Sequence, residues 1–157
     1  MFGFYIRNNI GIAFQVFASG IFVAVGSLFF IAMNGVMMGA IAGFLTERGL
    51  SETFYSFVVT HAAFELTAIV LAGGAGLRVG HSLLSPGRLT RTQALVVAAR
   101  QSVIIMYGAL GMLLIAAAVE AFWSSQTWIP PLMKYSVAAV CWISVLSYLT
   151  LQGRRAG

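Results

Sequence analysis

Apolar residues run along this chain in long blocks, separated by short stretches that hold its few charges. Several blocks are long enough for the roughly 20 residues with which an α-helix crosses a bilayer. The short alternating stretches typical of a membrane β-barrel are absent. The pattern therefore predicts an all-α, polytopic transmembrane helix bundle, a single domain over 1–157 with about four full spans and one shorter, glycine-rich segment.

The first apolar block is the longest, because residues 8–46 contain no charged side chain. It is too long for one ordinary span and too short for two spans with a turn between them. Asn34-Gly35 is a turn-forming pair and the best place for a break. We therefore expect a first span at about 10–33, followed by a half-helix or re-entrant segment at about 35–45.

Three more spans are predicted beyond this block. The turn Ser85-Pro86-Gly87 is followed by Thr90 and Gln93, whose spacing is that of a capping box and predicts the start of a helix. The beginning of that helix is amphipathic, so we expect a cytoplasmic segment at about 88–100 that lies on the membrane surface. The predicted spans are about 53–77, 101–121 and 135–151.

Small residues form faces on two of the predicted helices. Gly35, Gly39 and Gly43 recur every four residues along the predicted half-helix, and a second cluster closes the span at 53–77. Such faces let helix backbones approach closely, within one subunit or between subunits. The second cluster of expected helix-packing residues comprises Gly73, Gly76 and Gly80.

Composition excludes a water-soluble globule, because 60% of the residues are hydrophobic and only 8% are charged. The net charge of +5 does not indicate a nucleic-acid binder, since no compact basic domain carries it. The basic residues instead lie between apolar blocks, where they set topology and contact anionic headgroups. The residues expected to do so are Arg78, Arg88, Arg91 and Arg100.

An even number of crossings is needed if Arg7, this arginine group and the closing pair Arg154 and Arg155 all lie in the cytoplasm. Four full spans meet that condition, whereas a complete crossing by 35–45 would not. We therefore expect a multi-pass protein with both termini on the cytoplasmic side.

His61 and Glu65 are the most distinctive polar residues, because they are four apart on one helical face inside a predicted span. Asn34 is expected to lie near them. Three interpretations stay open: the group fixes helix packing, it belongs to an ion or proton pathway, or it binds a partner or metal.

A zinc site needs three or four ligands, and the His61–Glu65 pair provides two. His81 would lie about 30 Å further along a continuous helix, and we expect Glu120 at the outer interface, where Lys134 can neutralise it. An intramembrane hydrolase would need a serine or metal within hydrogen-bond distance of His61, and none is expected. We therefore predict no catalytic residue, no metal and no cofactor.

The chain contains four distinctive stretches: Arg7-Asn8-Asn9, Asn34-Gly35 with Gly39, His61 to Gly80, and Glu120-Ala121-Phe122. Together these stretches resemble the stage II sporulation protein M family, and the resemblance covers nearly the whole chain. Its most specific part begins with the histidine–glutamate run and continues through the glycine cluster. Many members of that family carry a cytoplasmic segment ahead of the first span, whereas here the first span follows almost directly on Met1.

The resemblance implies a bacterial or archaeal cytoplasmic-membrane protein. In spore formers the family's namesake is understood as a membrane scaffold that holds peptidoglycan-degrading enzymes and has no catalytic activity of its own. We therefore expect a non-enzymatic scaffold or assembly subunit, whose partners are the bilayer, other membrane proteins or a second copy, and cell-wall enzymes. The alternative is a small channel or transporter subunit that uses His61 and Glu65 to bind an ion or proton.

Overall fold

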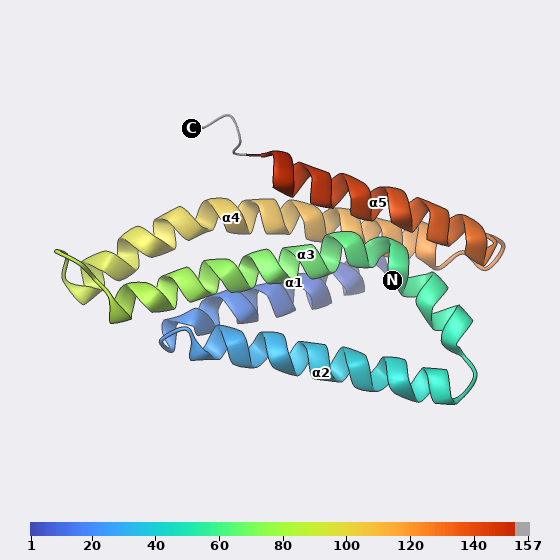
Figure 1. The fold of residues 1–157 in the computed structure, drawn as a ribbon, viewed down its shortest axis with the longest axis horizontal. Helices are drawn as coiled ribbons and strands as arrows, with labels where there is room; N and C mark the ends of the chain where they lie inside the picture. The colour runs from blue at the N-terminus through green and yellow to red at the C-terminus, as the bar shows by residue number, and fades with distance from the viewer. Residues whose placement is uncertain (153–157) are drawn as a thin grey trace.

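Five α-helices lie roughly along one axis in the computed structural model, which describes residues 1–152, and α2 and α4 run opposite to the other three (Figure 1). A 3₁₀ turn, η1 (Ser19–Ile21), follows α1, and a π-helical turn, η2 (Glu120–Ser124), extends α4. The α-helices are α1 (Phe2–Ala18), α2 (Val25–Glu47), α3 (Ser51–Leu84), α4 (Arg91–Val119) and α5 (Pro131–Leu151).

Four of these helices are long and apolar enough to cross a membrane: α2, α3, α4 with η2, and α5. The predicted class, an all-α polytopic transmembrane bundle, is therefore confirmed. The predicted Arg154 and Arg155 lie outside the described residues.

The short helix of the bundle is α1, and the half-helix predicted at 35–45 is wrong. α2 runs unbroken through Asn34 and Gly35. The chain reverses earlier, between α1 and α2, where Val23 (φ 56°) and Ala24 (φ 69°) adopt left-handed backbone conformations. The predicted first span at 10–33 is thereby divided between two antiparallel helices.

The position of this reversal follows from how its backbone is shielded. Irregular backbone at membrane depth must be covered by protein, and the reversal lies against the backbone of Gly76 and Gly80 on α3. The hydroxyls of Ser19 and Ser27 both donate to the carbonyl of Val16, at 3.0 and 2.7 Å. No other part of the described chain lies within 4 Å of a Cβ position at Gly35, so a break at that point would leave peptide groups unpaired in lipid.

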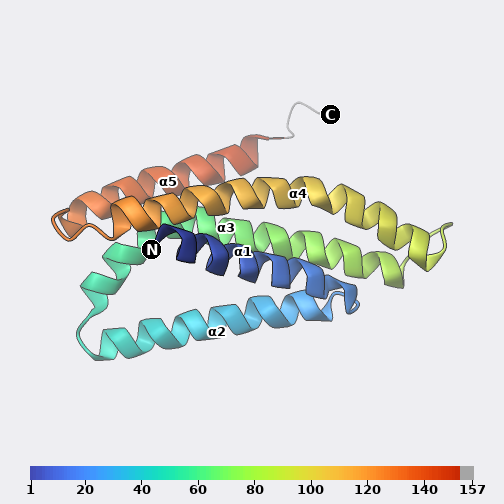
Figure 2. The ribbon, with the colours of Figure 1, turned by 180° about the vertical axis from the view of Figure 1, so that it is seen from behind.

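α3 is the central helix of the bundle, because each of the other four helices packs against it (Figure 2). The core where α1, α3 and α4 meet is built mainly from small side chains, which allow close approach of the backbones. It comprises Ala13, Ala68, Ala72, Ala75, Met106, Ala109 and Leu113.

The α3–α4 hairpin extends past the other helices and ends in the connection 85–90 (Figure 1). The capping box predicted for Thr90 and Gln93 is confirmed, with both reciprocal hydrogen bonds present. The position of 88–100 on the membrane surface stays a prediction. Residues from Arg91 onward are the first turns of α4, and they bury Ala94 and Ala98.

The two ends of the bundle differ in charge. The basic end is the α3–α4 connection with Arg78, Arg88, Arg91 and Arg100, whereas the opposite end holds the α2–α3 and α4–α5 connections (Figure 2). The start of α1 lies at the opposite end, where the ring of Phe2 is 5.6 Å from that of Phe122. The assumption that Arg7 shares a side with the arginine group is therefore wrong, because α1 reaches back along the bundle.

Candidate buried polar site

His61 and Glu65 lie one turn apart on α3 and face the bundle interior. Their side chains are almost fully buried, and His61 Nε2 is 3.8 Å from Glu65 Oε2. This separation is close enough for electrostatic attraction but too long for a hydrogen bond. The predicted pairing of the two residues on one helical face is therefore present, although the carboxylate does not orient the ring by a direct hydrogen bond.

Glu120 is buried and joins this pair, so the expectation that it lies apart from His61 and Glu65 is wrong. One side-chain ligand atom from each of His61, Glu65 and Glu120 lies within 4.8 Å of the others. Two features of the helices explain the difference. α3 begins at Ser51, so His61 is only about 15 Å from its start, and α4 continues through the π-helical turn η2, which keeps Glu120 inside the bundle.

The π-helical turn also brings Ser124 to the site. The amide of Ser125 donates to the carbonyl of Glu120, five residues earlier, at 3.2 Å. Ser124 Oγ then lies 3.2 Å from His61 Nδ1, and both groups are buried. The expectation that no serine approaches His61 is therefore wrong. In a hydrolase triad a carboxylate hydrogen bond orients the histidine through its other ring nitrogen, whereas here Glu65 Oε2 lies 3.8 Å from His61 Nε2.

Lys134 lies beside Ser124 rather than pairing with Glu120 as predicted. The Lys134 ammonium donates to the carbonyl of Ser124 at 2.8 Å, and the backbone carbonyl of Lys134 accepts from Thr60 Oγ1 at 3.3 Å. Among the described residues, His61–Glu65 is the only pair of opposite charge type within 4.0 Å. Lys134 therefore ties α5 to η2 and leaves the two buried glutamates without a cationic side chain.

Asparagine enters the site from α1 and not from α2. Asn9 is 2% exposed and approaches the carboxylate of Glu120. The predicted Asn34 lies instead at a cleft of about 380 Å³ between α1 and α2, with Asn8 and Gln15. The polar pair Asn8-Asn9 inside an apolar block was the available sequence signal, but the register of α1 on α4 that brings Asn9 inward is a tertiary feature.

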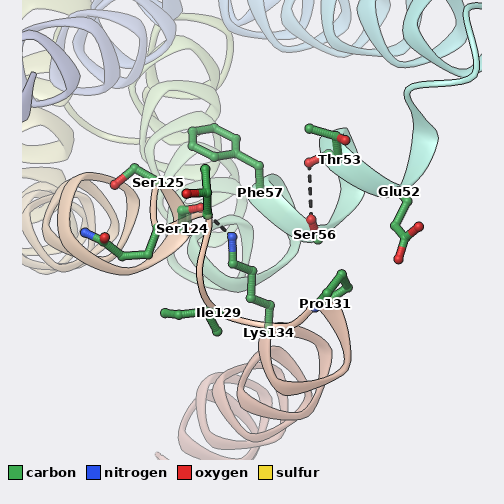
Figure 3. Close-up of a pocket in the computed structure, with 11 residues that line it drawn as sticks. Glu52, Thr53, Ser56, Phe57, Ser124, Ser125, Ile129, Pro131 and Lys134 are labelled. Carbon is green, nitrogen blue, oxygen red and sulfur yellow. Dashed lines mark hydrogen bonds between the residues drawn. The ribbon is translucent and has the colours of Figure 1, made fainter.

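A pocket of about 580 Å³ lies beside this group at the opposite end of the bundle. Figure 3 shows the Lys134 side chain directed toward Ser124, with the Phe57 ring close by. Phe57 also contacts the His61 ring, with centroids 5.3 Å apart. The pocket thus reaches the outer side of the Ser124–His61 contact. Its lining also includes Glu52, Thr53, Ser56, Ser125, Gln126, Thr127, Ile129 and Pro131.

The six predicted packing glycines divide into two groups. Gly76 and Gly80 on α3 face the end of α1 and the turn that follows it, with no room for a Cβ atom, whereas a Cβ atom on Gly73 would meet the end of the Ile31 side chain. Gly35, Gly39 and Gly43 on α2 have no other part of the described chain within 4 Å of a Cβ position. The α2 glycines therefore leave an open face.

The predicted topology arginines are all exposed at the basic end. Arg78 on α3 donates a hydrogen bond to the side-chain oxygen of Gln101 on α4. Arg88, Arg91 and Arg100 lie in or after the connection. None of the four belongs to the buried polar site.

A model of the family described as stage II sporulation protein M matches residues 1–125, which include α1 to α4 and η2. No curated protein and no solved structure matches the chain.

Proposed function

Because the chain belongs to the stage II sporulation protein M family, we propose that it is an integral membrane scaffold or assembly subunit without catalytic activity of its own. Its setting would be a bacterial or archaeal cytoplasmic membrane. Its partners would be other membrane proteins or a second copy and, as the family resemblance implies, cell-wall enzymes.

The observation that carries the proposal is the exposure of α2. No residue in its most apolar 18-residue stretch is buried against the rest of the described chain. Gly35, Gly39 and Gly43 lie on one face of this helix, and nothing within the described chain occupies the space above them. A face of this kind suits the close approach of another transmembrane helix.

The test is co-purification of tagged protein in mild detergent. Gly39→Leu fills the open face without touching the subunit's own packing, so we expect partner recovery to fall at least about tenfold while helicity and monodispersity stay unchanged. Gly111→Leu is the matched control, because Gly111 on α4 also has open space around it.

Retention of the partner by Gly39→Leu would contradict the proposal. Recovery of only a second copy of the chain would identify self-assembly as the role of α2.

A second candidate is a channel or transporter subunit in which the buried polar site binds an ion or proton. The observation that favours it is the pocket of about 580 Å³ that reaches Ser124, the hydrogen-bond partner of His61. Ion flux in proteoliposomes that was lost in Glu65→Gln, while partner recovery stayed intact, would favour this candidate over the scaffold.

We also propose that the basic end faces the cytoplasm, since positively charged connections are retained there. α2 starts and α5 ends toward this end, so the four long helices would begin and finish on the cytoplasmic side. Met1, which precedes α1, would then lie on the outer side, unlike the arrangement expected above with both termini in the cytoplasm.

A further inference from the structure

We propose that His61, Glu65 and Glu120 bind one divalent transition-metal ion of the Zn²⁺ class. The proposal goes beyond the assembly role and does not depend on it. It stands on the geometry of the donors, on a carboxylate oxygen without a partner, and on the charge of the group.

The donors come from two elements that hold them at one depth in the bundle. His61 and Glu65 are four apart on α3, the spacing with which one helical face presents two ligands to a metal. Glu120 comes from η2 and completes a set of ligand atoms within 4.8 Å of one another. Tetrahedral zinc ligands, each about 2.1 Å from the metal, stand roughly 3.4 Å apart. Binding of one ion would therefore require the three donors to move closer together, which side-chain rotation can provide.

An unpartnered carboxylate oxygen is the second observation. Glu120 is 8% exposed, and its Oε2 has no hydrogen-bond partner among the described residues. The adjacent Asn9 amide nitrogen also has none. Buried polar groups without partners are rare because their desolvation is costly. A cation held by Glu120 would supply the missing interaction.

The charge of the site matches a divalent cation. Two glutamates carry two negative charges when ionised, and a neutral imidazole adds a nitrogen donor without adding charge. The nearby ammonium of Lys134 is bonded to the Ser124 carbonyl, and no carboxylate oxygen of residues 1–152 lies within 4.0 Å of it. The two other glutamates of the chain, Glu47 and Glu52, are exposed.

The contacts of His61 identify which ring nitrogen faces the metal. Nδ1 lies 3.2 Å from Ser124 Oγ, whereas Nε2 points toward Glu65. Metal-bound histidines usually make such a hydrogen bond through the second nitrogen, which fixes the ring orientation. An imidazole with two carboxylates suits zinc and similar ions better than Mg²⁺ or Ca²⁺, which prefer oxygen donors alone.

The experiment measures Zn²⁺ binding to the full chain, purified in detergent and stripped with a chelator. We expect one Zn²⁺ per chain by elemental analysis and by titration against a chromophoric chelator. Changing a residue that contacts a metal ligand, rather than the metal itself, costs about 10–100-fold in affinity. Loss of a ligand should cost more, so we expect Glu65→Gln, Glu120→Gln and His61→Asn each to weaken binding at least about 100-fold.

The chain supplies a matched control for each change. Glu47→Gln and His81→Asn alter the same residue types at exposed positions and should bind Zn²⁺ like the original chain. Circular dichroism and size-exclusion chromatography of metal-free samples verify that each variant is folded. Co²⁺ bound to the unaltered chain should give the visible absorption of a four-coordinate site, a readout that needs no variant.

Three results would overturn the proposal. The first is absence of stoichiometric Zn²⁺ binding to the unaltered chain, which would indicate that the two carboxyls hold protons instead. The second is equal loss in the control variants, and the third is unchanged binding in Glu65→Gln and Glu120→Gln. Partner recovery measured on the same samples separates failure of the metal site from failure of the assembly role.

Discussion

The glycines on α3 differ in whether other parts of the described chain occupy the space that a Cβ atom would need. A Cβ atom on Gly76 would meet the hydroxyl of Ser27 and, at 2.9 Å, the carbonyl oxygen of Phe17, whereas Gly74 has open space. Overpacking of a filled site costs about 1–3 kcal/mol, so we expect Gly76→Ala to lower the free energy of unfolding by that amount. Thermal unfolding in detergent measures it.

Gly74→Ala is the control for this prediction. It should be neutral or stabilise the protein by up to about 1 kcal/mol, because alanine favours helix over glycine. Equal destabilisation by both changes would show that Gly76 has no special packing role.

Individual polar residues of the buried site can be identified from the sequence, but which of them lie together in space cannot. Residue spacing placed His61 and Glu65 on one face because both lie on one helix. Glu120 and Ser124 reach them only through the π-helical turn and the crossing of α4 over α3, and neither feature has a local signature. Asn9 depends on α1 in the same way.

The reversal between α1 and α2 contains local backbone strain. Val23 is exposed and has φ 56°, a region that costs a β-branched residue about 1–2 kcal/mol. We expect Val23→Gly to raise the free energy of unfolding by relieving this strain. The gain is partly offset because glycine increases the conformational entropy of the unfolded chain. The measurement is again unfolding in detergent.

Val36→Gly makes the same substitution at a position where we expect it to lower the free energy of unfolding. Val36 is exposed in the interior of α2, where glycine costs about 0.5–1 kcal/mol. If Val23→Gly destabilised the chain as much as Val36→Gly, the strain at Val23 would not be a determinant of stability.

At the scale of whole helices, the length of the first apolar block predicts that the chain must fold back within it. The length does not predict where the reversal lies. Asn34-Gly35 has the turn chemistry, yet a helix in lipid continues wherever breaking it would leave peptide groups unpaired. The true break has two positive-φ residues, Val23 and Ala24, that no turn rule favours. Its cover by Gly76 and Gly80 on α3 is a contact between segments distant in sequence.

The orientation of the whole molecule can be tested with single cysteines. In a Cys141→Ala background, which removes the chain's only cysteine, we compare Ser85→Cys at the basic end with Ser125→Cys at the opposite end. We expect a membrane-impermeant maleimide to label Ser125→Cys in right-side-out vesicles and Ser85→Cys in inverted ones. The reverse labelling would place the basic end outside.

The membrane class is predictable from composition alone, because a chain with 8% charged residues cannot cover a globule with polar surface. The number of long spans follows from the apolar blocks. The side of the bundle on which Arg7 lies is not predictable, since it depends on whether the short first helix reaches back along α3.

The central position of α3 has a consequence for biosynthesis. The chain emerges from the ribosome N-terminus first, so α1 and α2 reach the bilayer before the helix that both pack against has been made. α2 can remain in lipid until α3 has been synthesised, because its apolar surface stays exposed even in the folded chain. α1 carries Asn9, whose burial requires later segments. We therefore expect the nascent chain to assemble around its third helix, and folding of the first half to be completed only after the second half begins to arrive.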